Sequence, residues 1–127
     1  MSNDLVVLYI EDESDIREVT EFALEDEGFE LVSCELGSQA ISQAQELKPD
    51  LLLLDVMMPG MDGPSTLKKL REFPHLANTP VIFMTAKVQA GELKEYEDMG
   101  AIGTIGKPFD PMTLADEIRN LLERNRA

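Results

Sequence analysis

Long apolar runs alternate with amphipathic stretches along the whole chain. The runs predict β-strands at residues 5–10, 29–34, 50–55, 80–86 and 102–106. Three of them, LVVLYI, DLLLLD and PVIFMTA, are almost continuously apolar, which is typical of strands that are buried on both faces. The fifth run, IGTIG, is short, and its glycines weaken the strand pattern.

Between these runs, apolar residues recur at the three- and four-residue spacing of amphipathic helices. The first helix is predicted at residues 14–27, where Gly28 ends it, and the fourth at residues 89–99. Ser38 is the predicted N-cap of the second helix, which Lys48-Pro49 stops.

The third and last helices have the clearest inward faces. Leu67 and Leu70 face inward in the third helix, and the last helix has Asp110 as its predicted N-cap with Pro111 at its first position. Strand-then-helix units in this order predict an α/β fold, with a five-stranded parallel sheet flanked by five helices. We expect residues 1–127 to form a single domain. Ligands of such sheets bind outside the carboxyl ends of the strands.

The composition argues against several classes of protein. Cys34 is the only cysteine, which excludes a disulfide scaffold and a multi-cysteine zinc site and fits a reducing cytoplasm. No apolar run approaches the roughly 18 residues that a membrane span needs. The start, MSNDLVVLYIED, lacks the basic region of a secretory signal. The net charge of −14 argues against nucleic acid as a direct partner, because phosphate binding needs a basic face.

Polar side chains stand at the carboxyl ends of four predicted strands: Glu11-Asp12, Asp55, Thr85 and Lys107. If the sheet is parallel, these side chains converge on one rim. Three ionised carboxylates in one place repel each other, and the lysine compensates only one negative charge. Mg²⁺ is the natural further cation, because it prefers oxygen ligands and keeps coordination positions for water or phosphate oxygens.

A site with Mg²⁺, an ammonium group and a hydroxyl group suits a phosphoryl group, whose oxygens would each have a partner. Asp55 is the best candidate nucleophile, because a buried strand holds it while the loop after it leaves one side open. Taken singly, each residue also has a simpler interpretation: Thr85 as a strand residue, Lys107 as a solvated lysine, Asp55 as a cap. The helix dipole accounts for Glu13 and Asp15, and His75 is interpreted as a surface loop histidine.

The motifs YIEDE, LLLLDVMMPGMDG, VIFMTAK and GKPFDP resemble the receiver domain of bacterial two-component response regulators. The resemblance covers nearly the whole chain and implies a flavodoxin-like receiver fold with strand order 2-1-3-4-5. It implies that a sensor histidine kinase or phosphotransfer protein phosphorylates Asp55, and that the output is altered binding to a downstream protein. The domain would catalyse only its own phosphorylation and dephosphorylation.

The resemblance also implies a role for each site residue. Mg²⁺ would be held by Glu11, Asp12, Asp55 and the main-chain carbonyl of Met57, and phosphoryl oxygens would be bound by Thr85 and Lys107. Receivers typically have a cis bond between the lysine and the following proline, so we predict a cis bond between Lys107 and Pro108.

One position departs from the family pattern. Many receivers carry a tyrosine or phenylalanine three residues before the lysine, where this chain has Thr104. An aromatic rotamer switch cannot operate there, so we hypothesise that activation moves the loop after Thr85 and the helix beyond it. A phosphorylation-dependent homodimer through the last two helices and the fifth strand remains open.

Two other functions fit the sequence less well than the signalling role. An aspartate-nucleophile phosphatase needs a second carboxylate just after the nucleophile, but Val56, Met57 and Met58 follow Asp55. A flavin mononucleotide carrier needs a phosphate-binding loop after the first strand, where EDESD would repel the phosphate. The chain ends in LLERNRA directly after the last predicted helix, which leaves a stand-alone regulator and a piece of a longer protein both open.

Overall fold

One parallel five-stranded sheet organises the chain in the computed structural model, which describes residues 4–86 and 90–126. The strand order is β2-β1-β3-β4-β5, as the resemblance implied. The strands are β1 Leu5–Ile10, β2 Phe29–Cys34, β3 Leu51–Asp55, β4 Val81–Thr85 and β5 Ala101–Gly106. Each predicted strand is therefore confirmed to within one residue at either end.

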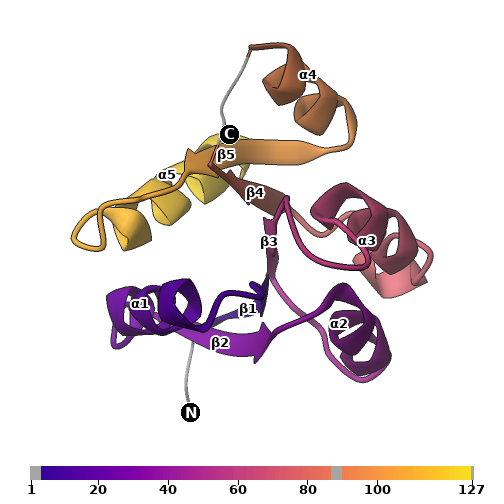
Figure 1. The fold of residues 1–127 in the computed structure, drawn as a ribbon, viewed down its shortest axis with the longest axis horizontal. Helices are drawn as coiled ribbons and strands as arrows, with labels where there is room; N and C mark the ends of the chain where they lie inside the picture. Colours follow the sequence, from indigo (N-terminus) through magenta and orange to yellow (C-terminus); the bar gives the residue numbers. More distant parts are fainter. Residues whose placement is uncertain (1–3, 87–89, 127) are drawn as a thin grey trace.

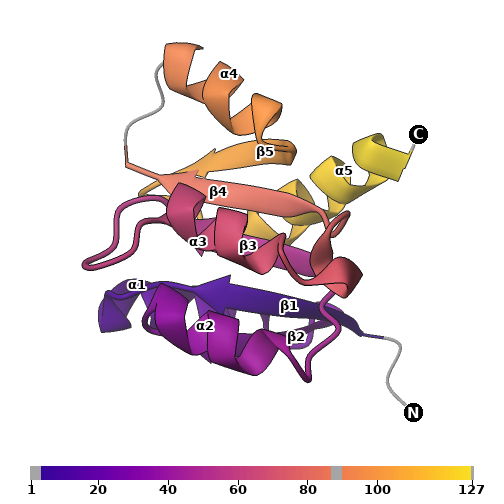
Figure 2. The same ribbon diagram turned by 90° about the vertical axis from the view of Figure 1, so that its right-hand side faces the viewer.

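Helices cover both faces of the sheet (Figures 1 and 2). They are α1 Ser14–Leu24, α2 Gly37–Ala44, α3 Gly63–Leu70, α4 Ala90–Asp98 and α5 Leu114–Arg126, with a short 3-10 helix, η1, at Pro74–Leu76. Buried residues of α1 and α5 pack on one face of the sheet, and those of α2, α3 and α4 pack on the other. The two apolar cores are thus separated by the sheet itself.

The leucine run of β3 supplies both cores. Leu52 and Leu54 belong to the core under α2 and α3, whereas Leu51 and Leu53 belong to the core under α1 and α5. Side chains of successive strand residues point to opposite faces, so a strand covered on both sides must be apolar throughout. All four leucines are fully buried. This packing fixes the backbone that leads into Asp55.

Two predicted helix boundaries are wrong. The first helix ends at Leu24 rather than at residue 27, and a turn leads on to Gly28, whose φ is +89°. The second helix begins at Gly37, with Leu36 as N-cap, so Ser38 is not the cap. The side chain of Gln39 accepts the Leu36 backbone N–H at 3.1 Å instead. Packing sets this start, because a Cβ at Gly37 would clash with the Thr66 side chain of α3.

The segment around Asp110 differs in detail from the prediction. Its Oδ1 accepts the Met112 N–H at 2.9 Å, and its carbonyl accepts the Leu114 N–H at 3.1 Å. Asp110 therefore caps an opening turn, and the regular helix α5 begins three residues later than predicted. Residue 89, where the fourth helix was predicted to begin, lies outside the described residues.

The predicted cis bond between Lys107 and Pro108 is confirmed. Within residues 4–86 and 90–126, none of the helices has the length and apolar character required to cross a lipid bilayer.

Candidate phosphoryl and metal site

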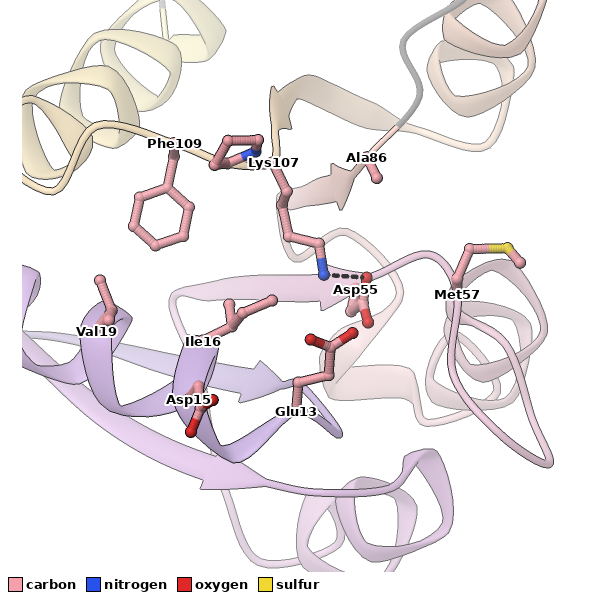
Figure 3. Close-up of a pocket in the computed structure, with 10 residues that line it drawn as sticks. Glu13, Asp15, Ile16, Val19, Asp55, Met57, Ala86, Lys107 and Phe109 are labelled. Carbon is pink, nitrogen blue, oxygen red and sulfur yellow. Dashed lines mark hydrogen bonds and ion pairs between the residues drawn. The ribbon is translucent and has the colours of Figure 1, made fainter.

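Acidic and basic side chains meet at the carboxyl edge of the sheet. Asp55 is the last residue of β3 and Glu11 directly follows β1; their exposed fractions are 2% and 0%. Lys107 follows β5, and its Nζ contacts Asp55 Oδ1 and Glu11 Oε1, each at 3.0 Å (Figure 3 draws the contact with Asp55). Residues separated by up to 96 positions in the sequence are therefore joined directly.

Asp12 completes the acidic cluster. Carboxylate oxygens of Glu11, Asp12 and Asp55 lie within 4.8 Å of one another. Among the described residues, Asp12 Oδ1 is buried and has no hydrogen-bond partner, which is costly for a charged oxygen. Three carboxylates face one ammonium group, and all their ligand atoms are hard oxygens. This donor set fits a divalent cation such as Mg²⁺.

Burial and mutual repulsion perturb these groups. Burial raises the pKa of Glu11 to about 7; the Lys107 hydrogen bond opposes this rise, and the neighbouring Asp55 adds to it. Burial alone would lower the pKa of Lys107, but its bonds to Asp55 and Glu11 outweigh burial and raise that pKa above its usual value. The lysine is thus held as a cation, while the carboxylates still lack positive charge.

Thr85 and Met57 both lie at the carboxyl edge of the sheet, but Thr85 is buried and Met57 is exposed. Thr85 is the buried last residue of β4, and its carbonyl accepts the Lys107 backbone N–H at 2.9 Å. The strand register therefore places Thr85 beside the lysine. The Met57 side chain is 76% exposed and lines the cavity next to Asp55, whereas the role of its carbonyl as a metal ligand remains a prediction.

A cavity of about 500 Å³ opens beside Asp55 and Lys107 (Figure 3). Its other lining residues come mainly from α1 and from the segments after β3, β4 and β5: Glu13, Asp15, Ile16, Val19, Met57, Ala86, Pro108 and Phe109. The Glu13 carboxylate points toward Asp55 in Figure 3. The helix-dipole interpretation of Glu13 and Asp15 therefore missed their position on the cavity wall. Their place directly after the Glu11-Asp12 pair was the available signal.

Gly63 lets α3 approach Asp55 closely. Its N–H donates to the Val56 carbonyl at 2.9 Å, and an added Cβ would clash with the Asp55 carbonyl and lie 3.1 Å from Val56 Cα. Asp62 caps the same helix by accepting the Ser65 N–H at 2.8 Å. The loop that follows the candidate nucleophile is therefore fitted tightly against the end of β3.

His75 takes no part in this cluster. Its Nε2 lies 2.7 Å from the Ala44 carbonyl and 3.1 Å from the Leu47 carbonyl, so it contacts the end of α2. The side chain is exposed. This agrees with its interpretation as a surface histidine and gives it a capping contact that the sequence did not reveal.

Comparisons with known proteins agree on one family. The sequence profile described as "Response regulator receiver domain" matches residues 7–119. Response regulator Rre1 of Synechocystis is 35% identical over 128 residues, which cover 100% of this chain and 55% of that protein. DNA-binding response regulator MtrA of Mycolicibacterium smegmatis is 34% identical over 119 residues, which cover 94% of this chain and 51% of that protein. The chain thus spans about half the length of these curated relatives.

Solved structures give the same result. The chemotaxis response regulator CheY4 of Vibrio cholerae superimposes with a TM-score of 0.86 at 30% identity, covering 93% of this chain and 98% of that chain. The Francisella response regulator 1452 receiver domain superimposes with a TM-score of 0.83 at 28% identity, covering 96% and 99% of the two chains.

Proposed function

The chain belongs to the response regulator receiver domain family, and we propose that it is a Mg²⁺-dependent phosphoacceptor whose phosphorylation site is Asp55. The proposal treats residues 1–127 as one receiver domain. The observation that carries it is the contact of Lys107 with both Asp55 and Glu11, beside a buried Asp12 oxygen that has no hydrogen-bond partner within residues 4–86 and 90–126. An ordinary surface cluster would leave these carboxylates in water.

In this proposal Asp55 is the nucleophile. One of its carboxylate oxygens forms a bond to phosphorus while the bond from phosphorus to the donor's imidazole nitrogen breaks. Lys107 and the Thr85 hydroxyl bind oxygens of the transferred group, so negative charge that develops there has fixed partners. Because β3 is buried on both faces, the nucleophile is held in place before the donor arrives.

Glu11, Asp12, Asp55 and the Met57 carbonyl would hold Mg²⁺. When bound, the ion would neutralise charge on the phosphoryl oxygens and on the carboxylates together. Two observations on the described part of the chain support this assignment: the buried Asp12 oxygen has no hydrogen-bond partner there, and the pKa of Glu11 is raised despite its bond to Lys107.

Donor and target proteins follow from the same proposal. The phosphoryl donor would be a sensor histidine kinase or a phosphotransfer protein in the cytoplasm, and the output would be altered binding to a downstream protein.

The net charge of −14 argues against direct contact of this domain with nucleic acid. MtrA is named a DNA-binding response regulator, but that name describes a protein of which this chain matches 51%. A homodimer that forms on phosphorylation would be a second form of the same output.

Intact-mass measurement tests the proposal. The protein is incubated with Mg²⁺ and acetyl phosphate, and we expect one added phosphoryl group that is absent in Asp55→Asn and without Mg²⁺. Asp98→Asn, which changes an exposed aspartate at the end of α4, serves as the matched control and should be phosphorylated normally. Loss of the added mass in both variants, or in neither, would contradict the assignment of Asp55. Multiple turnover of a phosphate ester would favour the phosphatase alternative instead.

A further inference from the structure

Arg17 of α1 turns inward to the acidic edge of the sheet. Its side chain is 16% exposed, and its Nη1 donates to the Glu11 carbonyl at 2.9 Å. Its Nη2 pairs with Glu35 Oε1 at 3.3 Å, so the guanidinium joins the end of β1 to the segment after β2. Neither contact involves a carboxylate of the candidate metal site.

The contact with the Glu11 carbonyl has a specific geometric consequence. That carbonyl belongs to the peptide bond that joins Glu11 to Asp12. Because the peptide unit is planar, fixing its oxygen fixes the orientation in which both residues leave the strand. On the other side, the Glu11 N–H donates to the Cys34 carbonyl of β2 at 3.0 Å. The main chain of Glu11 is thus held both by the sheet and by Arg17.

We propose that Arg17 is a positioning residue for the metal site, because it fixes the peptide bond between Glu11 and Asp12 and so orients both carboxylates before the cation binds. This inference rests on the proposed function, in which both residues hold Mg²⁺. Groups that orient metal ligands without touching the metal commonly contribute about 10- to 100-fold to metal affinity.

Arg119 offers a matched control at the other end of the molecule. It donates to the Glu27 carbonyl at 2.7 Å and pairs with Glu27 Oε1 at 3.0 Å, so it makes the same two kinds of contact as Arg17. It belongs to α5 and lies outside the acidic cluster. Replacing either arginine by methionine removes a carbonyl contact and ion pairing while keeping an apolar stem. Arg119→Met also removes a second ion pair, with Asp116 at 2.7 Å, so this control loses at least as many contacts as Arg17→Met.

The experiment measures Mg²⁺ binding to the metal-free protein by titration calorimetry. We expect Arg17→Met to weaken binding by about 10-fold and Arg119→Met to leave it within about twofold of the wild type. Arg17→Lys keeps the charge but lacks the planar fork, so we expect it to restore only part of the affinity. In the metal-free state, the Asp12 amide resonance should shift in Arg17→Met and stay unchanged in Arg119→Met.

Three results would overturn the positioning role: wild-type affinity in Arg17→Met, equal weakening in Arg119→Met, or full recovery in Arg17→Lys, which would show that charge alone matters. Thermal unfolding of each variant accompanies the titration, so a folding defect is recognised directly. Failure of the proposed function looks different, because the wild-type protein itself would then show no Mg²⁺ binding and no phosphorylation at Asp55.

Discussion

The β1–β3 edge and the α4 region of this domain are built differently. At the β1–β3 edge, Asp55 and Glu11 are almost fully buried and share Lys107 as a common partner. In α4, Tyr96 is the only buried residue among those whose side chains the structure describes. The centroid of its ring lies 4.9 Å from the centroid of the Phe83 ring. Regions with few buried contacts open at a lower cost in free energy. The proposed chemistry would thus lie on the more buried region, and we expect movement to be easier in the α4 region.

Two glycines provide the largest contrast between these regions. A Cβ at Gly63 would clash with the Asp55 carbonyl, whereas nothing lies within 4 Å of a Cβ built at Gly91 in α4. We expect Gly63→Ala to lower the free energy of unfolding by about 3 kcal/mol and to slow phosphorylation, because overpacking displaces the proposed nucleophile. We expect Gly91→Ala to raise stability by about 0.5–1 kcal/mol. Urea denaturation measures both, and a neutral Gly63→Ala would contradict the close fit.

Replacing Lys107 tests how much its contacts with the two buried carboxylates stabilise the β1–β3 edge. Lys107→Met leaves Glu11 and Asp55 buried without their common cation. We expect the metal-free protein to lose about 2–3 kcal/mol of stability, because a buried carboxylate left without its hydrogen-bond partner is costly. Lys94→Met, at an exposed position of α4, should change stability by less than about 0.5 kcal/mol. Thermal unfolding compares the two, and equal small losses would show that the Lys107 contacts contribute little.

The raised pKa of Glu11 predicts how stability depends on pH in the absence of metal. Because its pKa in the folded protein is about 7 rather than 4.5, the folded state binds the proton more tightly than the unfolded state. The associated stability is fully present below about pH 4.5 and is lost as the pH rises through 7.

A matched variant isolates this contribution. Because of Glu11, the free energy of unfolding of the wild-type protein should fall by on the order of 2 kcal/mol between pH 5 and pH 8. We expect this part of the fall to be absent in Glu11→Gln. Chemical denaturation in a chelating buffer at each pH measures this difference. An unchanged pH dependence in the variant would assign the effect to other carboxylates.

The smallest expected effect is the structural response in the α4 region. Thr104 lies in β5, opposite Phe83 of β4, and offers no aromatic side chain to rearrange. When a phosphoryl analogue occupies the site, we expect amide shifts to change in residues 90–106 beyond the immediate surroundings of Asp55. Two-dimensional NMR with and without the analogue detects them. Changes confined to the residues around Asp55 would contradict the hypothesis that activation moves the loop after Thr85 and the helix beyond it.

Much of the fold could be predicted because one physical pattern dominates it. Strands buried on both faces must be apolar throughout, and the β3 leucines that supply both cores are the clearest example. The meeting of Asp55 with Glu11 followed from parallel strands, whose carboxyl ends share one edge. Neither inference required knowledge of side-chain packing.

The remaining details depend on neighbours that are distant in the sequence. The start of α2 is set by Gly37 against Thr66, so the capping preference of Ser38 was a misleading local signal. The close contact of Gly63 with the end of β3 is a matter of tertiary packing that the local sequence does not reveal. Likewise, the periodicity of α1 does not distinguish Arg17, whose partner is a main-chain carbonyl, from a solvated arginine.

A crystal structure with Mn²⁺ in place of Mg²⁺ tests the central claim most directly, because anomalous scattering locates the ion independently of the protein coordinates. We predict a single peak at the carboxyl edge of the sheet, held by carboxylate oxygens of Glu11, Asp12 and Asp55 and by the Met57 carbonyl. A metal-loaded crystal with no peak between these carboxylates, or with its peak at a different acidic cluster, would contradict the account.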